Sequence, residues 1–279
     1  MRFQVNRKRA DRSGSATKKR PPAVVALFLA FTCLILAKAP GAPPTAGILQ
    51  TGDLIWPKAP GAVVPYNSTP GDADSSDARR WKKEKDTYLE QLRRHPNPPA
   101  EERARYTQLS GMTYKEFVAM YLDDHSPEDG VPFGAGGVSV GHVGIIEVVD
   151  GVPTVIEAMV KPGVRRISYS EWLQERPGEL IWLGRLKNVS AKKRAAVARA
   201  AAAHIGKPYR FWNFNLKDDA GFYCSKLAWL SIVTATGVPP DDKPDAKRIL
   251  WFSPKQLMKS PQVSLVVNPG SYGSSRTGP

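Results

Sequence analysis

The sequence is poor in cysteine and histidine, with two cysteines and four histidines in 279 residues. Cys33 lies in an apolar run near the N-terminus, so the rest of the chain has Cys224 as its single thiol. An internal disulfide is therefore excluded for the body of the protein. An unpaired cysteine is either a small buried residue or has a chemical role, and the residues around Cys224 must decide between the two.

Acidic residues are also a minority, with 26 Asp and Glu against 40 Lys and Arg and a net charge of +14. Such a balance is typical of nucleic-acid binding until the charge is located. Residues 1–20 hold eight basic and one acidic side chain, which is half of the net charge, while the other 259 residues carry 32 basic and 25 acidic groups. We therefore expect no nucleic-acid partner; binding that survives removal of residues 1–40 and depends steeply on salt would contradict this.

Long apolar runs are scarce, and the one that stands out is "AVVALFLAFTCLILA", residues 23–37. Basic residues precede it and small residues follow it, which is typical of a secretory signal. The run is shorter than the ~20 residues of a comfortable membrane span, but Pro40 leaves cleavage open, so an uncleaved anchor is the alternative. A mitochondrial presequence is disfavoured because the run is apolar on every face. The basic N-terminus predicts an exported body in the periplasm or cell envelope, either free or anchored in the inner membrane.

The pattern of the remaining chain predicts an α+β fold. We expect a leader with a Pro/Gly linker over residues 1–47, a folded domain over 48–269 and a disordered tail over 270–279. Within the domain, residues 48–57 predict a strand and 78–124 predict helices interrupted by "HPNPP". Two β-branched runs around Asp150-Gly151 predict a hairpin. A short helix capped by Ser168 or Ser170, a strand at "LIWLGRL", an alanine-rich helix from Ser190 to Gly206, the Cys224 helix, and a final helical turn and strand follow.

Cys224 lies where irregular chain changes into the apolar helical pattern "SKLAWLSIV". A cysteine in the first turn of a helix meets unpaired backbone N–H groups and the positive end of the helix dipole, which favour a thiolate. The same N–H groups can hold the oxyanion that forms when a thiolate attacks a carbonyl. The location thus supplies half of a cysteine hydrolase, although burial as core remains the alternative at this point.

A nucleophilic cysteine needs a base, and the four histidines differ in their surroundings. His95, His125 and His204 lie in a Pro-rich break, an acidic loop and a helix end, and we interpret all three as structural. His142 begins a strand directly after Gly141, a position that can face a cleft. His142 is therefore the candidate general base.

The hairpin identifies a carboxylate for His142. If Asp150 and Gly151 form a two-residue turn, opposite residues add up to 301, and Glu157 lies diagonal to His142 on the same face of the pair, ~7–8 Å away at the backbone. Glu147 falls on the other face. A loop lengthened by Pro153, or a slip of one residue, would reverse this result.

Four segments, "GDLIW", "GHVGIIE", "VIEAM" and "GKPY…YCSKLAW", occur in this order. Together they resemble the permuted papain-like amidases of the YaeF/YiiX type, a circularly rearranged branch of the NlpC-type cell-wall peptidases, in which the His strand precedes the Cys helix. The resemblance implies a small antiparallel sheet packed on the Cys helix. It also implies Cys224 as nucleophile, His142 as base and Glu157 as the orienting third member.

Other residues receive secondary roles. Tyr223 and Ser225 flank the cysteine and are secondary candidates for the oxyanion site, although an orienting or packing role suits Tyr223 as well. Asp53 in "GDL" matches the family, and we interpret it as a structural cap of a turn. About 85 residues separate "GDLIW" from "GHVGI", so residues 67–135 are interpreted as a helical insertion that either walls the cleft or packs behind the sheet.

The sequence thus predicts a cysteine hydrolase with no cofactor and no metal. Its expected substrate is a cell-envelope amide, either a peptidoglycan peptide or an acyl amide. The alternatives are an acyl-lipid amidase, thioesterase or acyltransferase, and a non-catalytic envelope-binding module on the same fold. Residues 23–37 are the candidate for membrane association.

Overall fold

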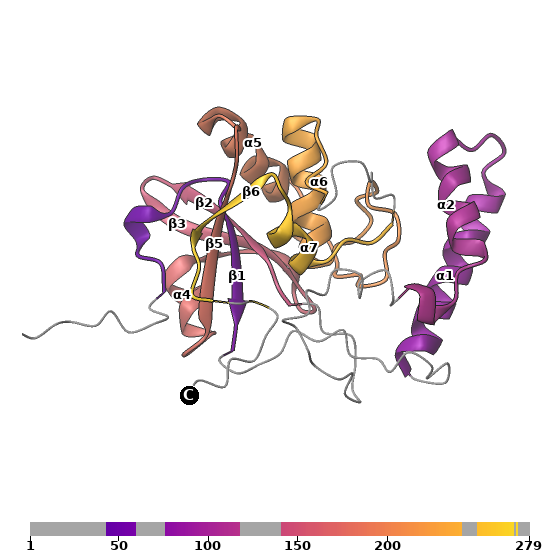
Figure 1. Cartoon of the computed structure of the whole chain (residues 1–279), viewed down its shortest axis with the longest axis horizontal. Helices are drawn as coiled ribbons and strands as arrows, with labels where there is room; N and C mark the ends of the chain where they lie inside the picture. Colours follow the sequence, from indigo (N-terminus) through magenta and orange to yellow (C-terminus); the bar gives the residue numbers. More distant parts are fainter. Residues whose placement is uncertain (1–42, 60–75, 118–140, 242–249, 271, 273–279) are drawn as a thin grey trace, which may run out of the picture. The chain divides into compact units, whose positions relative to one another are not determined.

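The protein is seen in a computed structural model that describes residues 43–59, 76–117, 141–241, 250–270 and 272 (Figure 1). In these ranges six strands form one antiparallel sheet in the spatial order β4-β3-β2-β1-β5-β6. The strands are β1 (Leu54–Lys58), β2 (Gly144–Val149), β3 (Val152–Met159), β4 (Gly163–Ser168), β5 (Leu180–Leu186) and β6 (Val263–Val267). The helices are η1 (Ala46–Ile48), α1 (Ser76–Arg94), α2 (Ala100–Ser110), α4 (Tyr169–Gln174), α5 (Ala191–Ala202), α6 (Cys224–Thr236) and α7 (Pro254–Lys259). The predicted α+β class is confirmed.

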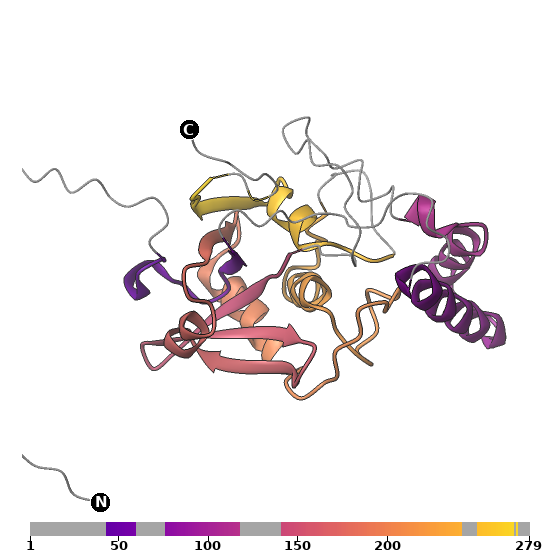
Figure 2. The same cartoon turned by 90° about the horizontal axis from the view of Figure 1, so that it is seen from below.

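The sheet is buried on both faces. Successive strand residues point to opposite sides of it, so neighbouring residues of one strand join different apolar clusters. In β1, Leu54 and Trp56 join the larger apolar cluster, which includes residues of α5 and α6, whereas Ile55 joins a smaller cluster with Trp172 of α4. Helices α5 and α6 lie side by side and contact β2 and β3 (Figures 1 and 2). The Cys-bearing helix therefore packs on the sheet, as expected.

The hairpin of β2 and β3 has the predicted register. Ile145 pairs with Ile156 and Val149 with Val152, so the residue numbers of opposite partners add up to 301. Asp150 and Gly151 have φ values of 50° and 79°, the positive values that a two-residue type I′ turn requires. Pro153 does not lengthen the loop, because it lies within β3.

Some boundaries differ from the prediction. β4 was missed, because residues 163–168 carry Arg165 and Arg166 where an apolar alternation would be expected. β1 runs through Pro57 to Lys58, since at that point it pairs only with β5 and the missing N–H of proline interrupts no ladder. The helix caps Ser168 and Ser190 are confirmed, but the alanine-rich helix ends at Ala202, before Gly206.

Within the predicted insertion, α1 and α2 are separated at residues 95–99, as "HPNPP" indicates (Figure 1). The insertion meets the rest of the domain through aromatic rings and an ion pair: the ring of Trp81 of α1 lies 6.4 Å from that of Phe214, Phe117 beyond α2 lies 5.6 Å from Trp212, and Glu101 of α2 pairs with Lys217 at 2.6 Å. These contacts attach the insertion to the segment that leads to Cys224.

Several predictions fall outside the described residues. The basic leader, the apolar run 23–37 with Cys33, and His125 are among them. In the ranges that the structure does describe, no helix is long and apolar enough to cross a membrane. The limits of the leader and of the 67–135 insertion stay predictions.

Candidate active site

Cys224 is the first residue of α6 and follows the N-cap residue Tyr223, which confirms its predicted place in the first turn. It is a free thiol, 6% exposed, and the one cysteine in the described ranges. The first N–H groups of a helix have no partner within it, and Cys224 belongs to that first turn of α6.

The residues that flank Cys224 hold the start of α6 in place. Tyr223 accepts a hydrogen bond at its hydroxyl from the backbone N–H of Phe252, 3.0 Å away, and Ser225 donates its hydroxyl to the carbonyl of Phe252 at 2.6 Å. Burial, followed by smaller effects, raises the pKa of Tyr223 well above its ordinary value, so its phenol stays neutral. Both side chains thus anchor the helix, and an oxyanion contact from Ser225 would use its backbone N–H.

His142 lies two residues before β2 rather than at the start of the strand as predicted, and a residue that sequence reasoning missed holds its backbone. The hydroxyl of Tyr272 accepts from the N–H of His142 at 3.1 Å and lies 3.3 Å from its carbonyl oxygen. Gly141 makes this approach feasible, because it has φ +80° and an added Cβ would lie 2.2 Å from the Tyr272 hydroxyl oxygen. At Tyr272, which is 5% exposed and packs edge-on against Trp182, the structure departs from the disorder predicted for residues 270–279.

The imidazole of His142 links Glu157 to Cys224. Its Nε2 lies 2.7 Å from Oε2 of Glu157, the carboxylate that the hairpin geometry selected, and Cys224 lies close enough to the ring to raise its pKa. Because Nε2 is engaged by Glu157, Nδ1 is the nitrogen left for the sulfur. Burial lowers the pKa of His142, but the hydrogen bonds and negative charges of Cys224 and Glu157 outweigh this effect and raise it to about 9.

Glu157 is fully buried in β3 and keeps its charge. Burial raises its pKa, but the hydrogen bond and charge of His142, the charge of Arg176 and the hydrogen bond from Arg165 lower it to about 2. Trp172 adds a hydrogen bond from its Nε1 at 2.9 Å. The donors around Glu157 were not predicted, because they come from β4 and from the end of α4.

The other residues singled out in the sequence lie apart from this site. Asp53 accepts the N–H of Gln50 at 2.9 Å and pairs with Arg185 at 2.7 Å, which is the turn-capping role expected of it. His95 pairs with Glu102 at 2.7 Å, and His204 packs on the ring of Phe222. Both histidines have the structural surroundings predicted for them.

A groove of about 670 Å³ lies between α1 and the segment that precedes Cys224. Tyr209 belongs to its lining, and the pKa of this tyrosine is raised first by burial and then by negative charge on Cys224. The lining residues are Arg80, Glu84, Thr87, Tyr88, Gln91, Val160, Tyr209, Arg210, Phe211, Trp212, Asn213, Phe214, Asp218 and Ala220. Helix α1 therefore forms one wall of this groove, whose lining includes Tyr209 but neither Cys224 nor His142.

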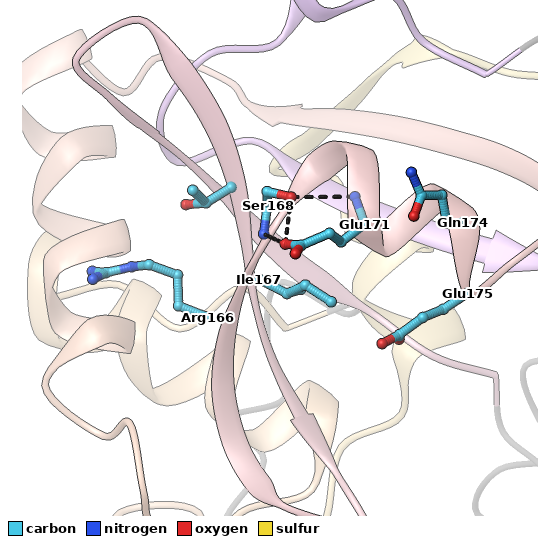
Figure 3. Close-up of a pocket in the computed structure, with 7 residues that line it drawn as sticks. Arg166, Ile167, Ser168, Glu171, Gln174 and Glu175 are labelled. Atoms are coloured by element: carbon cyan, nitrogen blue, oxygen red, sulfur yellow. Dashed lines mark hydrogen bonds between the residues drawn. The ribbon is translucent and has the colours of Figure 1, made fainter.

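A second hollow, of about 570 Å³, lies over β4 and α4 (Figure 3). Ser168 and Glu171 in its lining are bonded to each other, since Ser168 Oγ accepts from the N–H of Glu171 and the Glu171 carboxylate accepts from Ser168. These groups cap α4, and neither Cys224 nor His142 lines this hollow.

Comparison with solved structures finds the crystal structure described as metalloprotein yiiX from Escherichia coli O157:H7. It is 18% identical, the match covers 78% of this chain and 96% of that chain, and the TM-score is 0.40. In the described ranges of the present chain, no three His, Cys, Asp or Glu side chains are grouped to hold a metal ion. Comparison with curated proteins finds no match.

The family comparison is specific. Residues 124–271, more than half of the chain, match the model of the permuted papain-like amidase enzymes, YaeF/YiiX, C92 family. The matched range contains His142, Glu157 and Cys224 and begins after α2, so β1 and the first two long helices lie outside it. The chain belongs to the permuted papain-like amidase family of the YaeF/YiiX type and has its fold.

Proposed function

We propose that this protein is a cysteine hydrolase that cleaves an amide bond in cell-envelope material. Cys224 is the nucleophile, His142 the general acid and base, and Glu157 the group that orients His142. The observation that carries the proposal is the bond of 2.7 Å between the buried Glu157 carboxylate and the imidazole of His142, with Cys224 at the start of α6 acting on the same ring. Membership of an amidase family supports amide hydrolysis as the reaction.

In the acylation step the Cys224 thiolate attacks the amide carbonyl carbon, and an S–C bond forms. The carbonyl oxygen takes the negative charge, and the free N–H groups of the first turn of α6 stabilise it. His142, whose pKa of about 9 keeps it protonated at neutral pH, donates its proton to the departing nitrogen as the C–N bond breaks. The amine leaves, and a thioester remains on Cys224.

In the deacylation step His142, now neutral, takes a proton from water as the water oxygen attacks the thioester carbon. The S–C bond breaks, the carboxylic acid product leaves, and Cys224 recovers its thiolate beside protonated His142. Glu157 holds the ring in one tautomer and orientation throughout both steps.

The substrate class follows from two further features. The basic leader and apolar run support export, which brings the enzyme to envelope amides such as peptidoglycan peptides or acyl amides. The groove between α1 and residues 209–220 contains Tyr209, on which the charge of Cys224 acts, and offers aromatic rings together with charged groups of both signs. We place the substrate in this groove, with α1 as the wall that selects it.

A thiol-reactive amide probe tests the chemistry. Labelling of the Cys224 peptide should vanish in Cys224→Ala and fall at least tenfold in His142→Ala, because the base is lost. His95→Ala, an exposed histidine with its own carboxylate partner, is the matched control and should label like the wild type. Equal labelling of wild type and His142→Ala would refute the proposal.

Incubation with purified peptidoglycan fragments, acyl amides and acyl thioesters, with products read by mass spectrometry, tests the substrate. Once one class is cleaved, Arg80→Glu in the groove should raise KM severalfold and leave the alkylation rate of Cys224 unchanged. Lys83→Glu makes the same charge change at an exposed position of α1 outside the groove. Equal KM values for the two variants would remove the groove from the substrate site.

A further inference from the structure

The carboxylate that holds His142 has an unusual number of cationic neighbours. Arg165 of β4 donates to Oε1 of Glu157 through Nε at 3.0 Å and Nη2 at 2.6 Å. Arg176, after α4, donates to Oε2 through Nη2 at 3.0 Å. The oxygen that meets His142 is thus shared with Arg176, and the other oxygen is taken by Arg165.

Both arginines are held rigidly. Arg176 is 8% exposed, its guanidinium lies 4.3 Å from the centre of the Trp172 ring, and its Nη1 donates to the carbonyl of Trp172 at 3.1 Å. Arg165 also binds Glu175 through Nη1 at 3.0 Å and through Nη2. A guanidinium held at several points keeps a fixed geometry toward its carboxylate.

The formal charges of this group cancel. Glu157 and Glu175 carry two negative charges, and Arg165 and Arg176 carry two positive charges. His142 therefore faces a hydrogen-bond acceptor that belongs to a neutral group. A buried carboxylate without such partners would hold a proton on the imidazole far more tightly.

We propose that Arg165 and Arg176 are positioning residues for the catalytic pair of Cys224 and His142. The two arginines neutralise Glu157, so that it orients His142 without locking the proton on the ring. This inference rests on the proposed function, because His142 must release its proton in acylation and accept one in deacylation. The two arginines adjust the proton affinity of His142 to that task.

The groups that govern the protonation of His142 come from every element around the site. Glu157 of β3 is faced by Arg165 of β4, by Arg176 and Glu175 at the end of α4, and by His142 before β2. His142 also meets the charge of Cys224 of α6, which in turn acts on Tyr209.

The experiment follows the rate of Cys224 alkylation by iodoacetamide from pH 4 to pH 11 at the Cys224 peptide, in the full-length chain. Loss of the positive charge in Arg165→Gln disfavours the thiolate and favours the proton on His142. The profile has two limbs, one where the thiolate of Cys224 forms and one where His142 loses its proton. Both limbs should therefore move to higher pH by about one unit. Glu157→Gln removes a negative charge and should move both limbs to lower pH.

Matched variants separate this role from a structural one. Arg165→Lys keeps the charge, so its profile should move by less than half of the shift seen in Arg165→Gln. Arg166→Gln removes the neighbouring arginine, which pairs with Glu147 at 2.7 Å on the other face of β4, and should leave the profile in place. A structural defect would lower the rate at every pH without moving the limbs.

The outcomes distinguish the two proposals. A wild-type profile that shows only the single ionisation of an ordinary thiol would refute the catalytic pair itself. A biphasic wild-type profile with unmoved limbs in Arg165→Gln, or limbs moved to lower pH, would overturn the role of the arginines and leave the hydrolase intact.

Discussion

The charge of Glu157 should make the stability of the fold depend on pH below neutrality. The pKa of Glu157 is about 2 in the folded protein against an ordinary value of 4.5 for a glutamate. A difference of about 2.5 pKa units corresponds to about 3 kcal/mol of unfolding free energy. This contribution is complete above the unfolded pKa and is lost as the pH falls from about 4.5 through 2, because there the unfolded chain binds the proton first.

Urea unfolding of wild type and Glu157→Gln, followed by circular dichroism from pH 7 to pH 2, measures this contribution. The variant should be less stable by about 3 kcal/mol at pH 7, since Arg165 and Arg176 lose their partner, and the two proteins should converge near pH 2. Other carboxylates titrate in both proteins, so the difference between the curves isolates Glu157. Glu147→Gln, in which Glu157 is intact, should keep the acid dependence of the wild type. Parallel curves for wild type and Glu157→Gln would refute the reasoning.

The stability of the fold above neutral pH provides a second test of the ion pair between His142 and Glu157. The folded pKa of His142 is about 9 against 6.5, so its contribution is complete below pH 6.5 and is lost as the pH rises through 9. The shifts of His142 and Glu157 describe one interaction, and its free energy is counted once. Glu157→Gln should therefore also flatten the loss of stability between pH 6.5 and pH 9.

Two substitutions test the support of His142. Tyr272→Phe removes the hydroxyl from the His142 backbone but keeps the ring on Trp182. Loss of the hydrogen bond, worth about 1 kcal/mol, should slow Cys224 alkylation about fivefold. A wild-type rate would contradict this role of Tyr272. Gly141→Ala forces a side chain into the Tyr272 hydroxyl at φ +80°, so it should lower the melting temperature and slow alkylation more than Tyr272→Phe does; a variant that melts and reacts like the wild type would show that Tyr272 does not hold this turn.

The hairpin shows how much of the site local sequence can predict. Asp150-Gly151 defines a turn, the turn defines the register, and the register puts Glu157 on the face of His142. The 2.7 Å contact between the two side chains agrees with that argument. Likewise, an irregular segment followed by an apolar helical pattern placed Cys224 in a first turn.

What the sequence did not predict depends on contacts between distant segments. Two adjacent arginines argue against a buried strand, yet Arg165 is partly buried in β4 because it meets Glu157 across the ladder. Tyr272 follows a Gly- and Ser-containing stretch that is typical of disorder, and only its contacts with His142 and Trp182 explain its burial. Periodicity cannot detect either case, because the partner lies in another part of the chain.

The faces of the sheet explain why the three candidate residues need one another. Glu157 lies on the face of β3 that meets Trp172 of α4, whereas Cys224 begins a helix packed on the opposite face. A carboxylate and a thiol on opposite faces have no direct contact through the strands, so a group at the end of the sheet must join them. His142 lies there, two residues before β2 and beside Glu157 near the end of β3, with one ring nitrogen for each. The tyrosine that fixes the His142 backbone and the arginines that neutralise Glu157 therefore act on the same bridge, one through its geometry and the others through its charge.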